Sequence, residues 1–239
     1  MNFLAVQDAD HAARLIYGRI EALVSASQYP VVVAVPGGTS PLPLFHLWRD
    51  EGKSRGTSFW EPLVLIQADE RIVPQTHPDS NARLIREHLT GGWKGLEQRF
   101  HPFPPDADPR DFLVQVLGSG SQGSDERLAP PTLTLLGLGN DGHVASLFPC
   151  CPADWKRREE AFISESPNHP HRRITLSFPW INAGSEIVLL ALGEKKRTAI
   201  ARFLSGDDSV PAVSLALNKL TLVSDIVSSD GRLIGPGVV

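Results

Sequence analysis

Apolar residues fall along this chain in short continuous runs that alternate with stretches at helical spacing. The continuous runs are typical of strands buried on both faces of a parallel sheet: Val31–Val35, Leu63–Gln67, Leu133–Gly137 and Glu186–Leu192. Shorter runs that predict strands are Phe3–Val6 and the alternating Arg173–Ser177. Periodic stretches predict helices at Ala9–Ser25, Pro41–Trp48, Ser80–His88 and Lys195–Leu204.

The repeated alternation of strand and helix predicts an α/β fold with a parallel sheet and helices on both faces. The glycine- and serine-rich stretches Gly91–Gly95 and Gly118–Ser124 are expected to be surface loops, and the proline-rich Phe103–Pro109 cannot form a regular helix. Because no long linker and no internal repeat interrupts the pattern, residues 1–239 are expected to form a single domain.

The composition is that of a globular protein with a sizeable core: of 239 residues, 41% are hydrophobic and 21% charged. A net charge of −4 does not favour nucleic acid or an anionic membrane, so a bound anion needs a local group of positive charges. No apolar run is long enough to span a membrane and residues 1–8 do not resemble a signal peptide, which favours the cytoplasm. The adjacent Cys150 and Cys151 cannot staple a fold and match no zinc pattern, so reduced packing residues are expected.

The segment after Val31–Val35 is a candidate phosphate cradle, because ligands of an open parallel sheet bind beyond the carboxyl ends of its strands. It reads Pro36-Gly37-Gly38-Thr39-Ser40-Pro41. The glycines allow a ligand to approach the backbone closely, and free amides at a helix N-terminus favour an anion. Thr39 or Ser40 could cap the next helix, with Pro41 in its first turn. An ordinary capped turn is the alternative.

Two later cations would add positive charge near such a cradle. Arg173 opens a predicted strand, and Lys196 follows Glu186–Leu192. Arginine can grip a phosphate with two hydrogen bonds and lysine supplies a compact charge. Each alone would usually be a solvated surface charge, but both are expected at the same end of one sheet.

Two further segments after strands carry the candidate catalytic groups. Asp69-Glu70-Arg71 follows Leu63–Gln67, with Asp79-Ser80-Asn81 at the start of the next helix; adjacent charges there are costly unless they are paired or used. The loop Gly137–Pro149 presents Asp141 and His143 among glycines. A neutral imidazole, with an ordinary pKa of about 6.5, can take a proton from water, and a nearby carboxylate can orient its ring. A surface or capping histidine is the alternative.

Several other chemistries are disfavoured by the sequence. Gly137, Gly139 and Gly142 match a dinucleotide fingerprint in spacing, but Asp141 would place a negative charge beside the pyrophosphate and no helix-forming run follows. The chain holds no serine-hydrolase elbow, Walker loop or His-Glu-x-x-His motif. His169 and His171 could bind a metal, but their own loop supplies no third ligand, so no metal is assigned.

Taken together, these segments resemble the 6-phosphogluconolactonases, which are related to the glucosamine-6-phosphate isomerases. The resemblance rests on blocks that occur in the family's order: Pro36–Pro41; Asp69–Pro74 with Ser80-Asn81; Gly137–Pro149; and Arg173–Leu176 with Gly193–Lys196. It implies a Rossmann-like sheet without a cofactor. It also implies hydrolysis of 6-phospho-D-glucono-1,5-lactone to 6-phosphogluconate, in the oxidative pentose phosphate pathway.

The resemblance assigns His143 as the general base, with Asp141 to orient it and Arg71 to contact substrate. The remaining assignments are to the phosphate site (Gly37, Gly38, Thr39, Ser40, Arg173, Lys196) and to the substrate pocket (Asp69, Glu70, Asn81, Gly139, Asn140, Gly142). The order Thr39-Ser40 departs from the more usual Ser-Thr, and Lys195 stands beside Lys196, so the contacting hydroxyl and lysine stay open. Monomer and homodimer also stay open.

Two alternatives accompany this interpretation. The isomerases resemble this chain but carry Glu before Pro where Phe148 stands, and usually Tyr where Arg71 stands; both differences favour a lactonase. A non-catalytic sensor of sugar phosphates would keep the cradle but would not need His143, Asp141 and Arg71 together.

Overall fold

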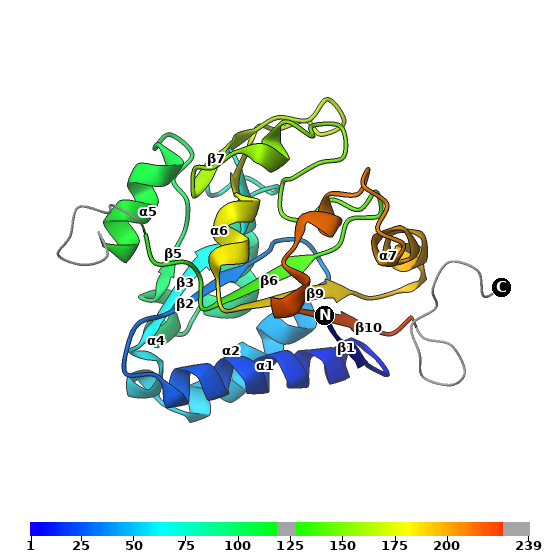
Figure 1. Ribbon diagram of the computed structural model, residues 1–239. Coiled ribbons are helices and arrows are strands. Elements are labelled where there is room, and N and C mark those ends of the chain that lie inside the picture. The colour runs from blue at the N-terminus through cyan, green and yellow to red at the C-terminus, as the bar shows by residue number, and fades with distance from the viewer. Residues whose placement is uncertain (119–127, 227–239) are drawn as a thin grey trace.

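The central sheet is open and parallel, as predicted (Figure 1). The computed structural model describes residues 1–118 and 128–226, and within them the sheet order is β1-β10-β9-β6-β2-β3-β5. Each neighbouring pair of strands is parallel. The strands are β1 Asn2–Ala5, β2 Val31–Val35, β3 Leu63–Gln67, β5 Phe100–His101, β6 Leu133–Gly137, β9 Glu186–Ala191 and β10 Leu220–Ser224.

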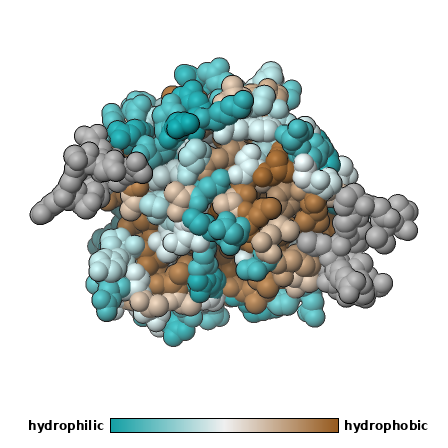
Figure 2. All heavy atoms as spheres, viewed as in Figure 1, coloured by the Kyte–Doolittle hydropathy of each residue, from teal (hydrophilic) through white to brown (hydrophobic). Residues whose placement is uncertain are grey.

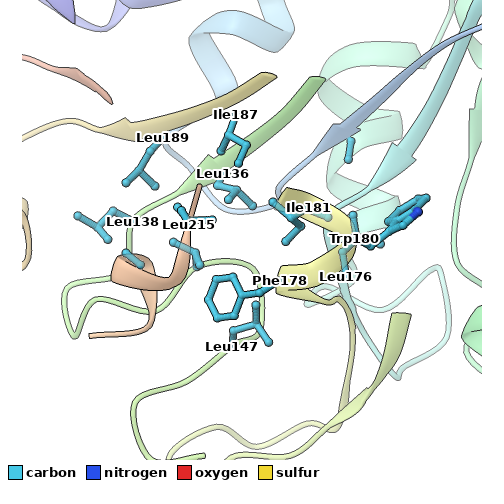
Figure 3. Close-up of a cluster of buried hydrophobic side chains, with 14 of the residues drawn as sticks. Leu136, Leu138, Leu147, Leu176, Phe178, Trp180, Ile181, Ile187, Leu189 and Leu215 are labelled. Carbon is cyan, nitrogen blue, oxygen red and sulfur yellow. The ribbon is translucent and has the colours of Figure 1, made fainter. Parts of the chain in front are cut away.

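Helices cover both faces of this sheet because alternate residues of the buried strands point to opposite sides. In β2, Val31, Val33 and Val35 join a core with α1, α2, α3 and α4, while Val32 and Ala34 join a core with α5, α6 and α7. Figure 3 shows part of the second core, with Leu136, Ile187 and Leu189 of the sheet and Phe178, Trp180 and Ile181 of α6. The α-helices are α1 Ala9–Ala26, α2 Leu42–Ser54, α3 Asn81–Ile85, α4 Lys94–Glu97, α5 Pro109–Leu117, α6 Phe178–Ala183 and α7 Arg197–Leu204.

A second, antiparallel sheet stands beyond the carboxyl end of β3. It has the order β4-β8-β7 and consists of β4 Asp69–Arg71, β7 Ala161–Ser164 and β8 Arg173–Leu176. The expectation that Arg173 lies at the end of the main sheet is therefore wrong. The alternating run 173–177 pairs instead with β4, which puts Arg173 directly opposite Arg71.

Other local expectations also need correction. Thr39 and Ser40 do not cap α2, whose N-cap is Pro41, and α2 runs on to Ser54. Of the stretch Gly91–Gly95, Gly91 and Gly92 form an exposed turn, as expected of a surface loop, but Trp93 and Gly95 are buried where α4 begins. Of the other expected loop, residues 119–124 lie outside the described residues. Cys150 is exposed and Cys151 partly so, and neither is a core residue.

Short helical turns complete the described chain. They are η1 Thr57–Trp60, η2 Arg86–Thr90 (a π-turn), η3 Asp154–Lys156, η4 Glu194–Lys196, η5 Pro211–Ser214 and η6 Leu217–Lys219. None of the helices in residues 1–118 and 128–226 has the length and apolarity needed to cross a membrane. Figure 2 shows hydrophobic residues around the β1–β10 side of the sheet and hydrophilic residues over the part that carries β7.

Candidate active site

The site lies where the sheet order reverses. From β2 the chain continues to β3 on one side, whereas β6, on the other side of β2, leads outward to β9. The loops that follow β2 and β6 therefore separate at the carboxyl edge, and such switch points hold the ligands of open α/β sheets. A cavity of about 330 Å³ opens there.

The cavity gathers nearly all of the residues singled out from the sequence. It is lined by Gly37, Gly38, Thr39, Ser40, Asp69, Arg71, Asn81, Gly139, Asn140, His143, Arg173 and Lys196, together with Pro36, Gly137, Leu138 and Ala145, which the sequence reasoning did not assign. Asp141, Glu70 and Gly142 are not in the lining. Lys196 lines the cavity and its exposed neighbour Lys195 does not, which favours Lys196 of the two.

The loop after β2 keeps its polar groups available to a ligand. Gly38 has a φ of 81°, a conformation that favours glycine. A Cβ on Gly37 would stand 1.8 Å from Oδ1 of Asn81, so only glycine permits this approach. Within the described chain, the amides of Gly38, Thr39 and Ser40 donate no hydrogen bond to protein. Thr39 and Ser40 both line the cavity, so the choice of the hydroxyl that contacts phosphate stays open.

Three cations face the cavity without a counter-ion. Arg71, Arg173 and Lys196 form no salt bridge among residues 1–118 and 128–226. Burial, and next the charge of Arg71, lowers the pKa of the Arg173 guanidinium. Burial also lowers the pKa of the Lys196 ammonium, against the charge of Asp141, which raises it. Like charges on facing strands are destabilising, so a bound anion would relieve this arrangement.

Glu70 is buried behind the cavity lining and fixes the segments that carry Arg71 and Asn81. Only 2% of this residue is exposed. Its carboxylate accepts hydrogen bonds from the amides of Arg71, Asn81 and Ala82 and from the side chains of Gln67 and Ser80, at 2.6–3.1 Å. Three of these donors lie at the start of α3, where the helix dipole favours a negative charge. Glu70 therefore ties α3 to β4 and has no contact with the cavity.

Asn81 and Asp69, which line the cavity, are also held in place by hydrogen bonds. Asn81 Nδ2 donates to the backbone carbonyl of Asp69 at 2.9 Å, and its Oδ1 accepts from Nη1 of Arg71 at 2.7 Å. Oδ2 of Asp69 accepts from the hydroxyl of buried Ser146 at 2.6 Å. Arg71 is thus oriented through one guanidinium nitrogen, while its buried Nε has no partner among the described residues. Ser146 was missed because a serine within an apolar run gives no signal of its own.

The loop after β6 presents the pair Asp141 and His143. Nδ1 of His143 lies 2.6 Å from Oδ1 of Asp141, and the His143 amide donates to the same oxygen at 3.2 Å. Burial alone would raise the pKa of the Asp141 carboxyl, but the hydrogen bonds from His143 outweigh it and lower that pKa to about 2. An ionised carboxylate only accepts, so Nδ1 carries the proton and Nε2 of the neutral ring keeps its lone pair.

Glycine is required at two positions of this loop. A Cβ on Gly139 would lie 2.2 Å from Nδ1 of His143, so the bare backbone makes room for the ring. Gly142 has a φ of 90°, and a Cβ there would meet Val210 at 2.5 Å. The loop that follows β6 contains no helix before η3 at Asp154, whereas a dinucleotide fingerprint requires a helix directly after its glycines.

Phe148 and His169 close the site beside His143. Phe148 is 1% exposed and stacks on His169, with ring centroids 4.6 Å apart. The ring of His143 meets both, at 5.3 Å from Phe148 and 5.9 Å from His169. From the sequence, His169 is only a possible metal ligand, and its contact with His143 is not predicted. Its place beside the pair depends on a long-range contact between two loops.

Two groups of side chains could hold a metal. Asp141, His143 and His169 form one, and His77, Asp79 and His171 form the other; within each group the ligand atoms lie within 4.8 Å of one another. The loop that contains His169 and His171 supplies no third ligand of its own. The fold supplies two ligands from another loop to each histidine.

Comparison with known proteins agrees with this fold. A model of the family described as Glucosamine-6-phosphate isomerases/6-phosphogluconolactonase matches residues 5–223. The chain therefore belongs to this family.

Individual relatives extend the comparison. The chain is 30% identical over 210 residues to the 6-phosphogluconolactonase of Pseudomonas aeruginosa, covering 85% of this chain and 84% of that one. It is 33% identical over 170 residues to the GDH/6PGL endoplasmic bifunctional protein of Oryctolagus cuniculus, covering 69% of this chain but only 21% of that much longer protein. The crystal structure of 6-phosphogluconolactonase from Thermotoga maritima superposes with a TM-score of 0.77 at 22% identity, covering 93% of this chain and 98% of that chain, and so shares the fold.

Proposed function

We propose that this protein hydrolyses 6-phospho-D-glucono-1,5-lactone to 6-phosphogluconate, a step of the oxidative pentose phosphate pathway. One observation carries the proposal: three cations that form no salt bridge among the described residues line the same cavity of about 330 Å³ as His143, which is paired with Asp141. Such a cavity suits a small sugar that carries a phosphate at one end and a reactive carbonyl at the other. Membership of the family and the name of the Pseudomonas aeruginosa relative support the same substrate.

In this reaction His143 acts as the general base. Its Nε2 takes a proton from a water molecule whose oxygen attacks the lactone carbonyl carbon, forming a tetrahedral intermediate with a negative oxygen. Asp141 keeps the ring in the tautomer that leaves Nε2 free and stabilises the imidazolium. The imidazolium then gives its proton to the ring oxygen as the carbon–oxygen bond breaks, which yields the open acid.

Cations and loop amides hold the charged parts of the substrate. Arg173 and Lys196, with the amides of residues 38–40, bind the phosphate and so orient the ring for attack. Arg71, oriented by Asn81 and by the carbonyl of Asp79, lies ready to stabilise the developing oxyanion. One such donor contributes about 3 kcal/mol in other hydrolases.

An isomerase is the second candidate, since it belongs to the same family. Moving a proton between carbons and opening an amino sugar require more acid–base groups than adding water to an ester. The isomerases resemble this chain but carry a glutamate where Phe148 stands. Here that position holds a buried aromatic ring packed on His169, and no acid–base group.

The test compares two substrates under the same conditions. Freshly made lactone is supplied, formation of 6-phosphogluconate is followed, and spontaneous hydrolysis is subtracted; the second arm supplies glucosamine 6-phosphate. We expect turnover of the lactone alone. Turnover of glucosamine 6-phosphate alone would overturn the proposal, and tight binding of 6-phosphogluconate without any turnover would indicate a sensor.

We further propose that the enzyme acts in the cytoplasm as a single domain over residues 1–239. The two free thiols, Cys150 and Cys151, suit a reducing compartment. Asp69, Asn81, Gly139 and Asn140, which line the cavity, are assigned to the substrate pocket in the same proposal, whereas Glu70 and Gly142 are not in its lining.

A further inference from the structure

A second group of histidines lies beside the cavity and is not used by the proposed reaction. His77 and Asp79 belong to the loop between β4 and α3, and His171 precedes β8. Nε2 of His171 lies 2.9 Å from Oδ2 of Asp79, and Nδ1 of His77 lies 3.9 Å from the same oxygen. The two imidazole rings meet edge to face, with centroids 5.5 Å apart.

The spacing of these atoms suits a tetrahedral metal ion. Ligand atoms about 2.0–2.1 Å from a tetrahedral Zn²⁺ stand roughly 3.3 Å from one another, a value between the two measured distances. Small side-chain movements would therefore bring the three atoms to one ion. An ion would displace two hydrogen bonds: the one of 3.1 Å from the Asp79 amide to Nδ1 of His77, and the one of 2.9 Å between Nε2 of His171 and Oδ2 of Asp79.

The chemistry and accessibility of the group point the same way. Two imidazoles and one carboxylate are borderline ligands that favour Zn²⁺ and similar first-row ions over Ca²⁺ or Mg²⁺. The side chains of His77, Asp79 and His171 are 39%, 53% and 25% exposed, so an ion can reach them from solvent. We propose that His77, Asp79 and His171 form a binding site for a divalent transition metal such as Zn²⁺, distinct from the hydrolytic centre.

The site is coupled to the cavity through backbone carbonyls. The carbonyl of Asp79 accepts from Nη1 of Arg71 at 2.8 Å, and the carbonyl of His171 accepts from Nε of Arg173 at 3.3 Å. An ion that joins the two loops would thus also fix the two arginines that face the cavity. This consequence, unlike the metal site itself, rests on the proposed function of those arginines.

The metal site is tested with the full-length protein, stripped by a chelator and titrated with Co²⁺. Tetrahedral Co²⁺ absorbs visible light, so the spectrum reports coordination directly. We expect one ion per chain, competed by Zn²⁺. Affinity should fall at least about tenfold in His171→Ala and in His77→Ala, because losing even a group that only orients a ligand costs about 10–100-fold.

Two controls separate this site from the group that contains His143. His143→Ala removes a ligand of that other group, and His11→Ala removes a histidine on α1, outside both groups. We expect both variants to bind Co²⁺ like the original chain. If binding is lost in His143→Ala but kept in His171→Ala, or if the original chain binds no Co²⁺, the proposal is wrong.

A second arm measures the coupling with 6-phosphogluconate as the probe. Its affinity is compared with and without one equivalent of Zn²⁺, in the original chain and in His171→Ala. We expect Zn²⁺ to tighten binding only in the original chain. If the ion binds but changes no affinity, the coupling is wrong and the metal site stands; if 6-phosphogluconate binds in neither state, the proposed function fails independently of the metal site.

Discussion

Two carboxylates flank the cavity, and the fold treats them in opposite ways. Glu70 is buried and accepts hydrogen bonds from the amides of Arg71, Asn81 and Ala82 and from two side chains. The side chain of Asp141 is 49% exposed and is bonded only to His143 among the described residues. A saturated buried carboxylate fixes a scaffold, whereas an open one is free to respond when its partner changes protonation.

The two carboxylates therefore have different roles at one site: Glu70 stabilises the structure, and Asp141 belongs to the proposed chemistry. Glu70 holds Arg71 and Asn81 in place, but Glu70 itself does not line the cavity. In the region around Asp141, Gly139 makes room for the ring of His143, and His143 lines the cavity. We therefore expect variants of the first region to lose stability first, and variants of the second to lose turnover first.

The largest effect is expected at His143. In His143→Ala, kcat for lactone hydrolysis should fall roughly 10²–10⁴-fold, the usual contribution of a general base, while the melting temperature stays nearly unchanged. Turnover is measured at several pH values with the spontaneous rate subtracted. His88→Ala, which changes a histidine of η2 that does not line the cavity, is the control. Near-normal kcat in His143→Ala would show that another group activates the water.

Glu70→Gln should give the next largest effect, mainly on stability. The side-chain amide replaces one of the two oxygens, so it places a donor against the backbone amide of either Asn81 or Ala82, and it removes charge-assisted hydrogen bonds worth about 1.5–3 kcal/mol each. The free energy of unfolding in urea should fall by about 3 kcal/mol. Glu61→Gln, at an exposed position, should change it by less than about 0.5 kcal/mol. An unchanged free energy of unfolding in Glu70→Gln would show that Glu70 does not stabilise the structure.

The main sheet and most of the cavity could be predicted from the sequence, because local patterns determine them. The buried runs of β2, β3 and β6 gave the main sheet, and the residues after them gave the cavity. What could not be predicted depends on contacts between distant segments. The sequence of Arg173–Leu176 does not specify that it pairs with Asp69–Arg71, and Glu70 could not be distinguished from a catalytic carboxylate before its donors were known.

The same limit explains the other corrections. Thr39 and Ser40 are good capping residues by type, but α2 begins after Pro41 and leaves their hydroxyls toward the cavity. His169 and His171 lie two residues apart in one loop, yet the fold directs them to two different groups. Local propensity gives the types of residue that can act, and tertiary pairing decides which of them meet.

A variant of Arg173 tests whether the cations of the cavity bind phosphate, and its effect should be smaller than those of His143→Ala and Glu70→Gln. Arg173→Met keeps an unbranched apolar side chain but removes the charged hydrogen bonds expected with phosphate, worth about 1.5–3 kcal/mol. KM for the lactone should rise roughly 10–100-fold with a smaller change in kcat. Arg172→Met is the matched control, since the neighbouring Arg172 is exposed and pairs with Glu165. Equal KM values in the two variants would exclude Arg173 from the phosphate site.

The smallest effect is expected from Asp141 on stability, and it depends on pH. The pKa of the Asp141 carboxyl falls from 3.8 to about 2 on folding, so the stabilisation it gives is complete above about pH 4 and is lost as the pH falls toward 2. Because about half of the side chain is exposed, water screens the pair and the contribution should stay below about 1 kcal/mol. Asp141→Asn should therefore be slightly less stable than the original chain at pH 7, with the gap closing as the pH is lowered. Urea unfolding at several pH values measures this gap, with Asp208→Asn at an exposed position as the control. A loss at pH 7 as large as that of Glu70→Gln would show that both carboxylates serve the scaffold.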